Sequence, residues 1–179
     1  MEGATRVKFE IKGIAPILFD RYHGLPDPKT PEGYKKQSIE KLYLDKDENI
    51  CIPSCCLKAA IRVASSELGK KMEGKKNRQA IRSGVFFDDF MLPTGYTKPD
   101  GIREDLVTRG NGDKVTRVIS YRPYLNEWIV SGEVSIFFIP VNFAKQAIEL
   151  AGIKYGLCGY RPEYGRFMVT KFDIIEDNE

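Results

Sequence analysis

The chain has 179 residues, which suits one domain or one domain that carries a large insertion. Its formal net charge is only +3, so composition alone cannot support nucleic-acid binding, and the argument depends on where the basic residues lie. The sequence has no signal peptide and no apolar run long enough to cross a bilayer, so we expect a soluble, cytoplasmic protein that does not bind membranes.

The N-terminal third predicts one strand, a long loop and a small hairpin. Residues 5–14 alternate between apolar and charged side chains, which is the period of a half-buried strand. The segment 20–36 is rich in glycine and proline and predicts a loop. Residues 41–44 and 50–52 flank a polar turn and predict the hairpin.

The middle of the chain predicts a helix, a basic connector and a strand. Ser54 is the expected N-cap of a helix that ends near Gly69 and has an apolar stripe. The basic run 69–82 follows, in which Arg78 and Arg82 lie one helical turn apart. Residues 85–91 predict a strand with an acidic interruption.

The C-terminal half predicts a protruding loop over 93–111, strands over 115–121 and 128–139, a helix capped by Asn142 that ends at Gly152, and a final strand over 166–174. The main elements follow the order strand, helix, strand, strand, helix, strand. This order predicts an α+β, ferredoxin-like (RRM-like) β-α-β-β-α-β fold, in which two helices cover one face of an antiparallel sheet. We expect a single domain over 1–179, with insertions at about 20–53 and 93–122.

Residues 156–169 combine three glycines with two tyrosines and two arginines. Glycine allows close backbone approach, arginine offers donors suited to phosphate, and tyrosine can stack on a base. The composition therefore favours a loop that binds a polyanion. The alternative is an ordinary helix-to-strand turn with surface arginines.

Three segments resemble the RAMP superfamily of CRISPR-associated proteins. They are residues 42–44 with 50–62, the glycine-rich residues 159–167, and the strand 7–18 that ends in Pro16-Ile17-Leu18. The resemblance implies an RNA-recognition-like fold that binds single-stranded RNA, often CRISPR RNA, and assembles along it in antiviral defence. Ser54-Cys55 and Pro162-Glu163 depart from the family pattern, which favours a viral or stand-alone relative.

The resemblance and the basic segments together give the predicted nucleic-acid site. Its members lie on the first helix, in the basic run, on the hairpin around Gly110-Asn111-Gly112 and in the glycine-rich loop. They are Lys58, Arg62, Arg78, Arg82, Arg109, Arg117, Arg122, Tyr160, Arg161 and Arg166. A solvated helix face or a plain connector is the alternative for the helical members. We expect RNA rather than DNA as the ligand, and a homo-oligomer or other CRISPR-type subunits as partners.

Two other functions stay open. His23 follows the first strand and could act as general base of a metal-independent endoribonuclease, with Lys58 as the cation. A protein-interaction module, such as an inhibitor that mimics a CRISPR subunit, is the other alternative. The four cysteines, Cys51, Cys55, Cys56 and Cys158, lack the spacing of a zinc site, so we expect buried reduced thiols and no metal or cofactor.

Overall fold

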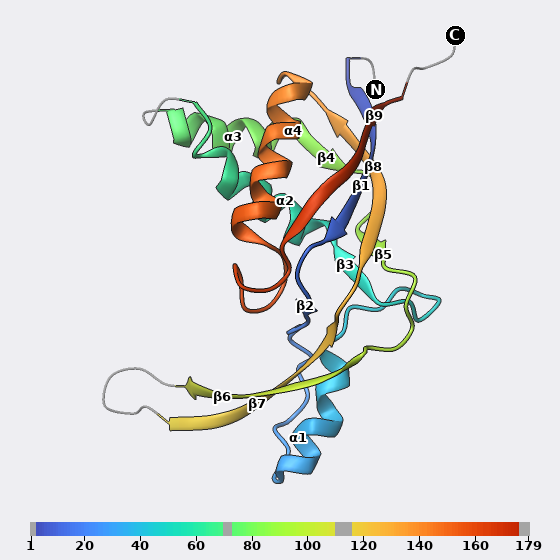
Figure 1. Cartoon of the computed structure of the whole chain (residues 1–179), viewed down its shortest axis with the longest axis vertical. Helices are drawn as coiled ribbons and strands as arrows, with labels where there is room; N and C mark the ends of the chain where they lie inside the picture. Colours follow the sequence, from blue (N-terminus) through green and yellow to red (C-terminus); the bar gives the residue numbers. More distant parts are fainter. Residues whose placement is uncertain (1–2, 70–72, 110–115, 176–179) are drawn as a thin grey trace.

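The computed structural model describes residues 3–69, 73–109 and 116–175. The protein is α+β, with antiparallel sheets and the main helices on one side of the largest sheet (Figure 1). That sheet has four strands in the order β4-β8-β1-β9. The strands are β1 (Thr5–Gly13), β4 (Val85–Phe87), β8 (Ile129–Ile136) and β9 (Phe167–Ile174). The arrangement is compatible with a ferredoxin-like fold.

The alternation predicted for the first strand is confirmed. Val7, Phe9 and Ile11 are buried, and β1 lies between β8 and β9 in antiparallel pairing. Trp128 closes the end of this core, where its indole Nε1 donates to the Ala15 carbonyl at 2.9 Å. A Cβ on Gly13 would lie 2.3 Å from that indole nitrogen, so the ring occupies the space of the missing side chain.

Three helices lie beside the main sheet: α2 (Ser54–Ser65), α3 (Gly74–Gly84) and α4 (Val141–Leu150). Leu57, Ile61 and Ala64 of α2 enter the core, as the apolar stripe predicts. The basic run is thus largely a helix, α3, rather than a connector. No helix of the described segments is long and apolar enough to cross a membrane.

Both predicted N-caps are wrong. Pro53 and Pro140 occupy the cap positions, so Ser54 is the first residue of α2 and Asn142 lies inside α4. Ser54 instead donates its hydroxyl to the Phe90 carbonyl at 3.3 Å. The helical path also continues past the predicted stop at Gly152, through the π-turn η3 (Ala151–Tyr155).

A ribbon of two long strands projects from the other end of the molecule (Figure 1). β6 (Gly101–Arg109) pairs with β7 (Thr116–Leu125), and β7 also pairs with β2 (Ile17–Leu18). The loop predicted over 93–111 is therefore wrong from residue 101 to 109. The predicted Asn-Gly turn lies outside the described residues. We call β6 and β7 the arm, and the main sheet with its three helices the body.

The segment 20–53 is less irregular than predicted. Helix α1 (Pro31–Gln37) and the 3₁₀ turn η1 (Ser38–Lys41) lie beside the arm (Figure 1). Thr30 caps α1, because its hydroxyl accepts a hydrogen bond from the Gly33 amide at 3.1 Å. The expected hairpin is reduced to a single bridge between Leu44 and Ile50. The strand that follows, β3 (Cys51–Pro53), pairs with β5 (Met91–Pro93) instead.

Candidate nucleic-acid interface

The glycine-rich loop, residues 156–166, is fixed between the body and the arm. Its Gly159 amide donates to the Leu18 carbonyl at 2.9 Å, and its Gly165 amide donates to the Pro16 carbonyl at 2.7 Å. The Leu157 amide closes the loop through a 2.9 Å bond to the Gly165 carbonyl. Backbone hydrogen bonds to the chain just after β1 therefore hold both halves of the loop.

This closure explains one of the glycines. Gly165 has a φ of +72°, which favours glycine, and a Cβ there would lie 2.1 Å from the Leu157 carbonyl oxygen. The sequence interpretation assigned the glycines to close contact with a ligand. At this position the close contact is with the loop's own backbone.

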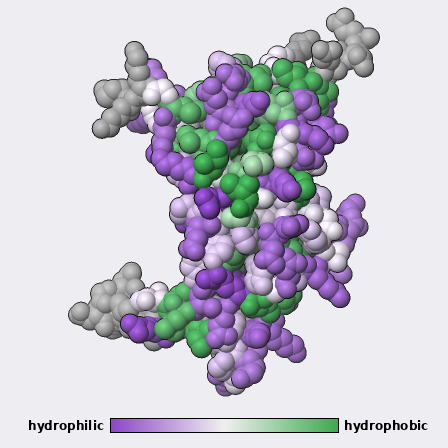
Figure 2. Space-filling view, viewed as in Figure 1, coloured by the Kyte–Doolittle hydropathy of each residue, from purple (hydrophilic) through white to green (hydrophobic). Residues whose placement is uncertain are grey.

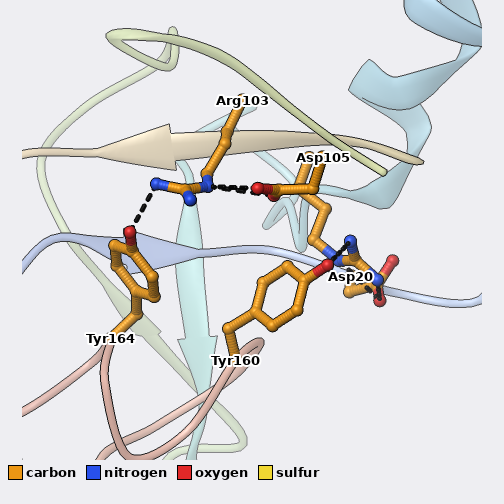
Figure 3. Close-up of polar contacts among 6 residues, drawn as sticks. Asp20, Arg103, Asp105, Tyr160 and Tyr164 are labelled. Atoms are coloured by element: carbon orange, nitrogen blue, oxygen red, sulfur yellow. Dashed lines mark hydrogen bonds and ion pairs between the residues drawn. The ribbon is translucent and has the colours of Figure 1, made fainter. Parts of the chain in front are cut away.

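Two tyrosines of the loop bond to two arginines of the arm, and we call these four residues the clasp (Figure 3). Arg122 of β7 donates to the Tyr160 hydroxyl at 3.0 Å, and its guanidinium lies 4.3 Å from the centre of that ring. Arg103 of β6 donates to the Tyr164 hydroxyl, with its guanidinium 5.0 Å from the ring. Arg103 and Arg122 are opposite one another in the β6–β7 register, so neighbouring cations hold both tyrosines.

Carboxylates neutralise both arginines of this clasp. Asp20 accepts from Arg122 at 2.9 Å and also pairs with Lys41 at 3.1 Å. Asp105 accepts two bonds from Arg103 at 2.9 Å, and these bonds raise the pKa of the Arg103 guanidinium. The Arg122 side chain is only 14% exposed. In this structure Arg122 and Tyr160, both predicted to bind nucleic acid, are engaged in positioning the loop.

Arg161 lies in the same loop but forms no ion pair with any carboxylate of the described segments. Its exposed side chain lines two pockets against α2. One, of about 360 Å³, also has Asp20, Tyr43 and Cys56 in its wall. The other, of about 670 Å³, is lined by Val63 and by Lys154, whose charge pairs with Glu67. Arg161 is thus an unneutralised cation on a fixed loop beside open space.

Lys58 of α2 and Arg82 of α3 form a second group of predicted cations. The Lys58 ammonium lies 4.2 Å from the centre of the Phe86 ring, and burial, followed by the charge of Arg82, lowers its pKa. Arg78 donates to the Ser66 hydroxyl at 3.2 Å. Lys58 and Arg82 therefore belong to the side of α2 that meets α3 and β4, whereas Arg161 lies against residues 56, 59 and 63 of α2.

The remaining predicted cations are dispersed. Arg62 is exposed on α2, Arg117 is exposed on the arm, and Arg166 is exposed just before β9. None of the three forms an ion pair within the described part of the chain. Arg109 belongs to β6, and its side chain lies outside what the structure describes.

His23 is not brought to the cation predicted for it. Its Nδ1 accepts from the Leu25 amide at 3.2 Å, and its ring stacks on Tyr22 with the centroids 6.5 Å apart. It lines a small pocket of about 50 Å³ with residues of α1 and the arm, including Tyr34. Lys58 lies on α2 in the body, whereas α1 lies beside the arm (Figure 1).

The sequence predicts that the cysteines are buried, but in the structure not all of them are. All four are free; Cys51 is buried, Cys55 is exposed, and Cys56 and Cys158 are half-buried. In the described ranges no group of three or more His, Cys, Asp or Glu side chains could hold a metal ion.

The sequence did not predict Arg103 with its partner Asp105, nor Lys41, which is the second cation that pairs with Asp20. The available signal was the spacing of Tyr160 and Tyr164, one on each side of the Pro162-Glu163 turn. Their partners could not be found, because the β6–β7 register places Arg103 opposite Arg122, and β6 carries too little apolar pattern to predict that register.

Comparisons with known proteins show likeness in fold only. No protein-family model matches the chain, and no curated protein matches it. A chain of the cryo-EM structure titled Type III-B Cmr-beta bound to cognate target RNA is similar at a TM-score of 0.55 and 15% identity. The match covers 97% of this chain and 61% of that chain, so this chain spans about three fifths of the length of its relative.

Cmr6 from Pyrococcus furiosus gives a TM-score of 0.48 at 12% identity, over 94% of this chain and 99% of that chain. No inference rests on this weaker match. The Cmr-beta likeness is consistent with the RAMP-like fold that the sequence resemblance implies.

Proposed function

We propose that the protein is a RAMP-like, CRISPR-associated subunit that binds single-stranded RNA through its backbone. The observation that carries this proposal is the anchored glycine-rich loop, which holds Arg161 beside an open pocket, where it forms no ion pair with any carboxylate of the described residues. An arginine carried by an ordered backbone binds phosphate with less loss of backbone entropy than an arginine on a mobile loop.

The direct contacts in this proposal come from exposed cations that form no ion pair within the described segments. Arg161 and Arg166 belong to the loop and its exit, and Arg62 lies on α2, the helix that lines both pockets. Arg122 and Tyr160 act indirectly, because they hold the loop against the arm. Lys58 and Arg82 belong to a separate basic surface, on the side of α2 that meets α3 and β4, and only a longer RNA strand also contacts it.

RNA is favoured over DNA by the fold likeness to a chain from an RNA-bound Cmr-beta structure. Backbone recognition gives little base preference, because phosphate contacts carry no sequence information. We further propose that several copies, or other CRISPR-type subunits, assemble along one strand.

The test compares the double variant Arg161→Ala, Arg166→Ala with Lys171→Ala, a charge removed from β9 at a distance from the loop. Binding is measured by fluorescence anisotropy with two unrelated single-stranded RNAs across a salt series. We expect the double variant to lose about tenfold or more in affinity for both RNAs and to show a shallower salt dependence. Equal affinity of the double variant and Lys171→Ala would remove the loop from the site.

A protein-interaction module is the second candidate, and a different surface favours it. Phe86 is 46% exposed and Phe138 is 94% exposed beside an apolar hollow of about 840 Å³ at β4, which is an edge strand. The space-filling view also shows apolar surface on the body (Figure 2). The partner we favour is a second copy of this chain. A dimer that forms without RNA, and whose stability does not depend on salt, would support this candidate over RNA binding.

A further inference from the structure

A cluster of thiols lies where the glycine-rich loop meets α2. Cys55 and Cys56 come from the first turn of α2 and Cys158 comes from the loop, and all three line the pocket of about 360 Å³ that also contains Arg161. Cys56 and Cys158, from two different elements, therefore face the same space. Residues about a hundred positions apart in the chain thus bring their thiols to one pocket.

The loop geometry holds Cys158 in this position. Cys158 has a φ of +61°, which is uncommon for a residue with a side chain. The next residue, Gly159, is bonded to Leu18, and the residue before it, Leu157, is bonded to Gly165. The backbone on both sides of Cys158 is therefore anchored, and its thiol is held against α2.

The thiols of Cys56 and Cys158 differ in acidity. Hydrogen bonds from Cys158 and then Cys55, together with the charge of Arg161, lower the pKa of Cys56 to about 7 against the opposing effect of burial. The same contact with Cys56, with burial, raises the pKa of Cys158. Cys56 is therefore the more acidic thiol of the pair, and the thiolate forms there first. Cys51 is a natural control, because burial raises its pKa to about 11.

We propose that Cys56 and Cys158 form a thiol–disulfide exchange site, in which Cys56 attacks a low-molecular-weight disulfide and Cys158 resolves the product into an internal disulfide. The pocket gives the external disulfide access to Cys56, and Cys55 stays reduced. This chemistry is independent of RNA binding.

The reaction balances in two exchanges. The Cys56 thiolate attacks one sulfur of the external disulfide, the external S–S bond breaks, and one thiolate leaves with its electron pair. Cys158 then loses its proton and attacks the Cys56 sulfur of the mixed disulfide, and the second external thiolate leaves. Cys56 and Cys158 are oxidised to one disulfide, and the external disulfide is reduced to two thiols. The product would covalently join the glycine-rich loop to α2.

The experiment treats the full chain with glutathione disulfide at neutral pH, blocks the remaining thiols with iodoacetamide, and maps the linkages by mass spectrometry without reduction. We expect a single Cys56–Cys158 disulfide, with Cys51 blocked only after unfolding. A disulfide between Cys55 and Cys56, a stable mixed disulfide on the wild-type chain, or no reaction would each overturn the proposal.

Three serine variants separate the roles. Cys158→Ser should accumulate the mixed disulfide on Cys56, Cys55→Ser should still form the internal disulfide, and Cys56→Ser should react about tenfold more slowly or not at all. A Cys55→Ser chain that fails to form the link, or a Cys56→Ser chain that reacts at the wild-type rate, contradicts the assignment.

A further variant does not alter the thiols. Arg161 is exposed, so Arg161→Gln should fold normally, and it should slow the alkylation of Cys56 at neutral pH several-fold and shift its pH profile upward. In the parent chain the alkylation rate should reach half of its maximum near pH 7, where the thiolate of Cys56 forms. An unchanged profile in Arg161→Gln, or a parent midpoint near that of a free cysteine, contradicts the proposal.

Discussion

The body and the arm are both built from antiparallel strands, but different contacts position them. In the body, alternate residues of β1 such as Val7 and Phe9 are fully buried under the helices. In the arm, the opposed residues Leu106 and Ile119 remain 66% and 41% exposed. What fixes one face of the arm is the polar clasp to the glycine-rich loop (Figure 3). The comparison teaches that stability resides in the body, whereas the site's geometry depends on a few polar side chains.

The largest expected effect comes from the core of the body. Trp128→Ala removes a ring that is 1% exposed, packs edge-on against Phe167 and bonds to Ala15. We expect a loss of about 3–5 kcal/mol in the free energy of unfolding, measured by urea denaturation. Phe138→Ala, at a 94% exposed ring, is the control and should change little. Similar losses in the two variants would break the distinction between core and surface.

The next effect tests the closure of the loop. Gly165→Ala places a Cβ against the Leu157 carbonyl, whereas Gly95→Ala, at a similar φ of +80°, meets nothing within 4 Å. Both variants share the cost of a strained backbone, about 1 kcal/mol. We expect Gly165→Ala to cost at least about 2 kcal/mol more in the same urea assay. Equal costs would mean that the closed conformation of the loop does not contribute to the free energy of unfolding.

The sequence predicts the body well and the arm poorly, for a physical reason. A strand with one buried face, such as residues 5–13, shows strict alternation, and buried helix faces show a stripe. The β6 strand has mostly polar or charged side chains, and its residues gain their order from β7, so its segment reads as a loop. Helix α1 was detectable from Thr30 and Pro31, which are capping signals, but the surrounding prolines and glycines obscured them.

The candidate site was predicted in part. The sequence identified the glycine-rich loop and Arg161, because that residue combination is visible locally. It did not show that Arg122 is hydrogen-bonded to Asp20 and Tyr160, because those bonds join residues far apart in the chain. It also did not show that Cys56 and Cys158 line the same pocket, for the same reason.

The third prediction concerns a variant that weakens only the contacts between the arm and the glycine-rich loop. Arg122→Met removes the bonds to Asp20 and Tyr160, and Arg117→Met removes an exposed, unpaired cation from the same strand as the control. We expect Arg122→Met to cost only about 1–2 kcal/mol in stability while amide hydrogen exchange in residues 157–165 becomes clearly faster. Equal protection of the loop in both variants would show that the clasp does not position it.

The smallest effect concerns the surface of the body. Hydrogen bonds from Thr170 and then Lys171 lower the pKa of the Glu10 carboxyl. A lowered pKa favours the folded state above the unfolded pKa, and this benefit fades as the pH falls through the folded value. By NMR titration we expect Thr170→Val to raise the pKa of Glu10 more than Lys171→Met does, with the unfolding midpoint nearly unchanged in both. The reverse order would mean that charge, rather than the hydroxyl bond, dominates at this edge.

The central claim is that a single strand of RNA lies against the anchored loop and α2 rather than along the arm. Photo-crosslinking with 4-thiouridine RNA, followed by mass spectrometry of the attached peptides, tests it directly. The account predicts crosslinks in the glycine-rich loop and in α2 near Arg62, which disappear in the Arg161→Ala, Arg166→Ala variant. Crosslinks confined to β6 and β7, or unchanged in that variant, would contradict it.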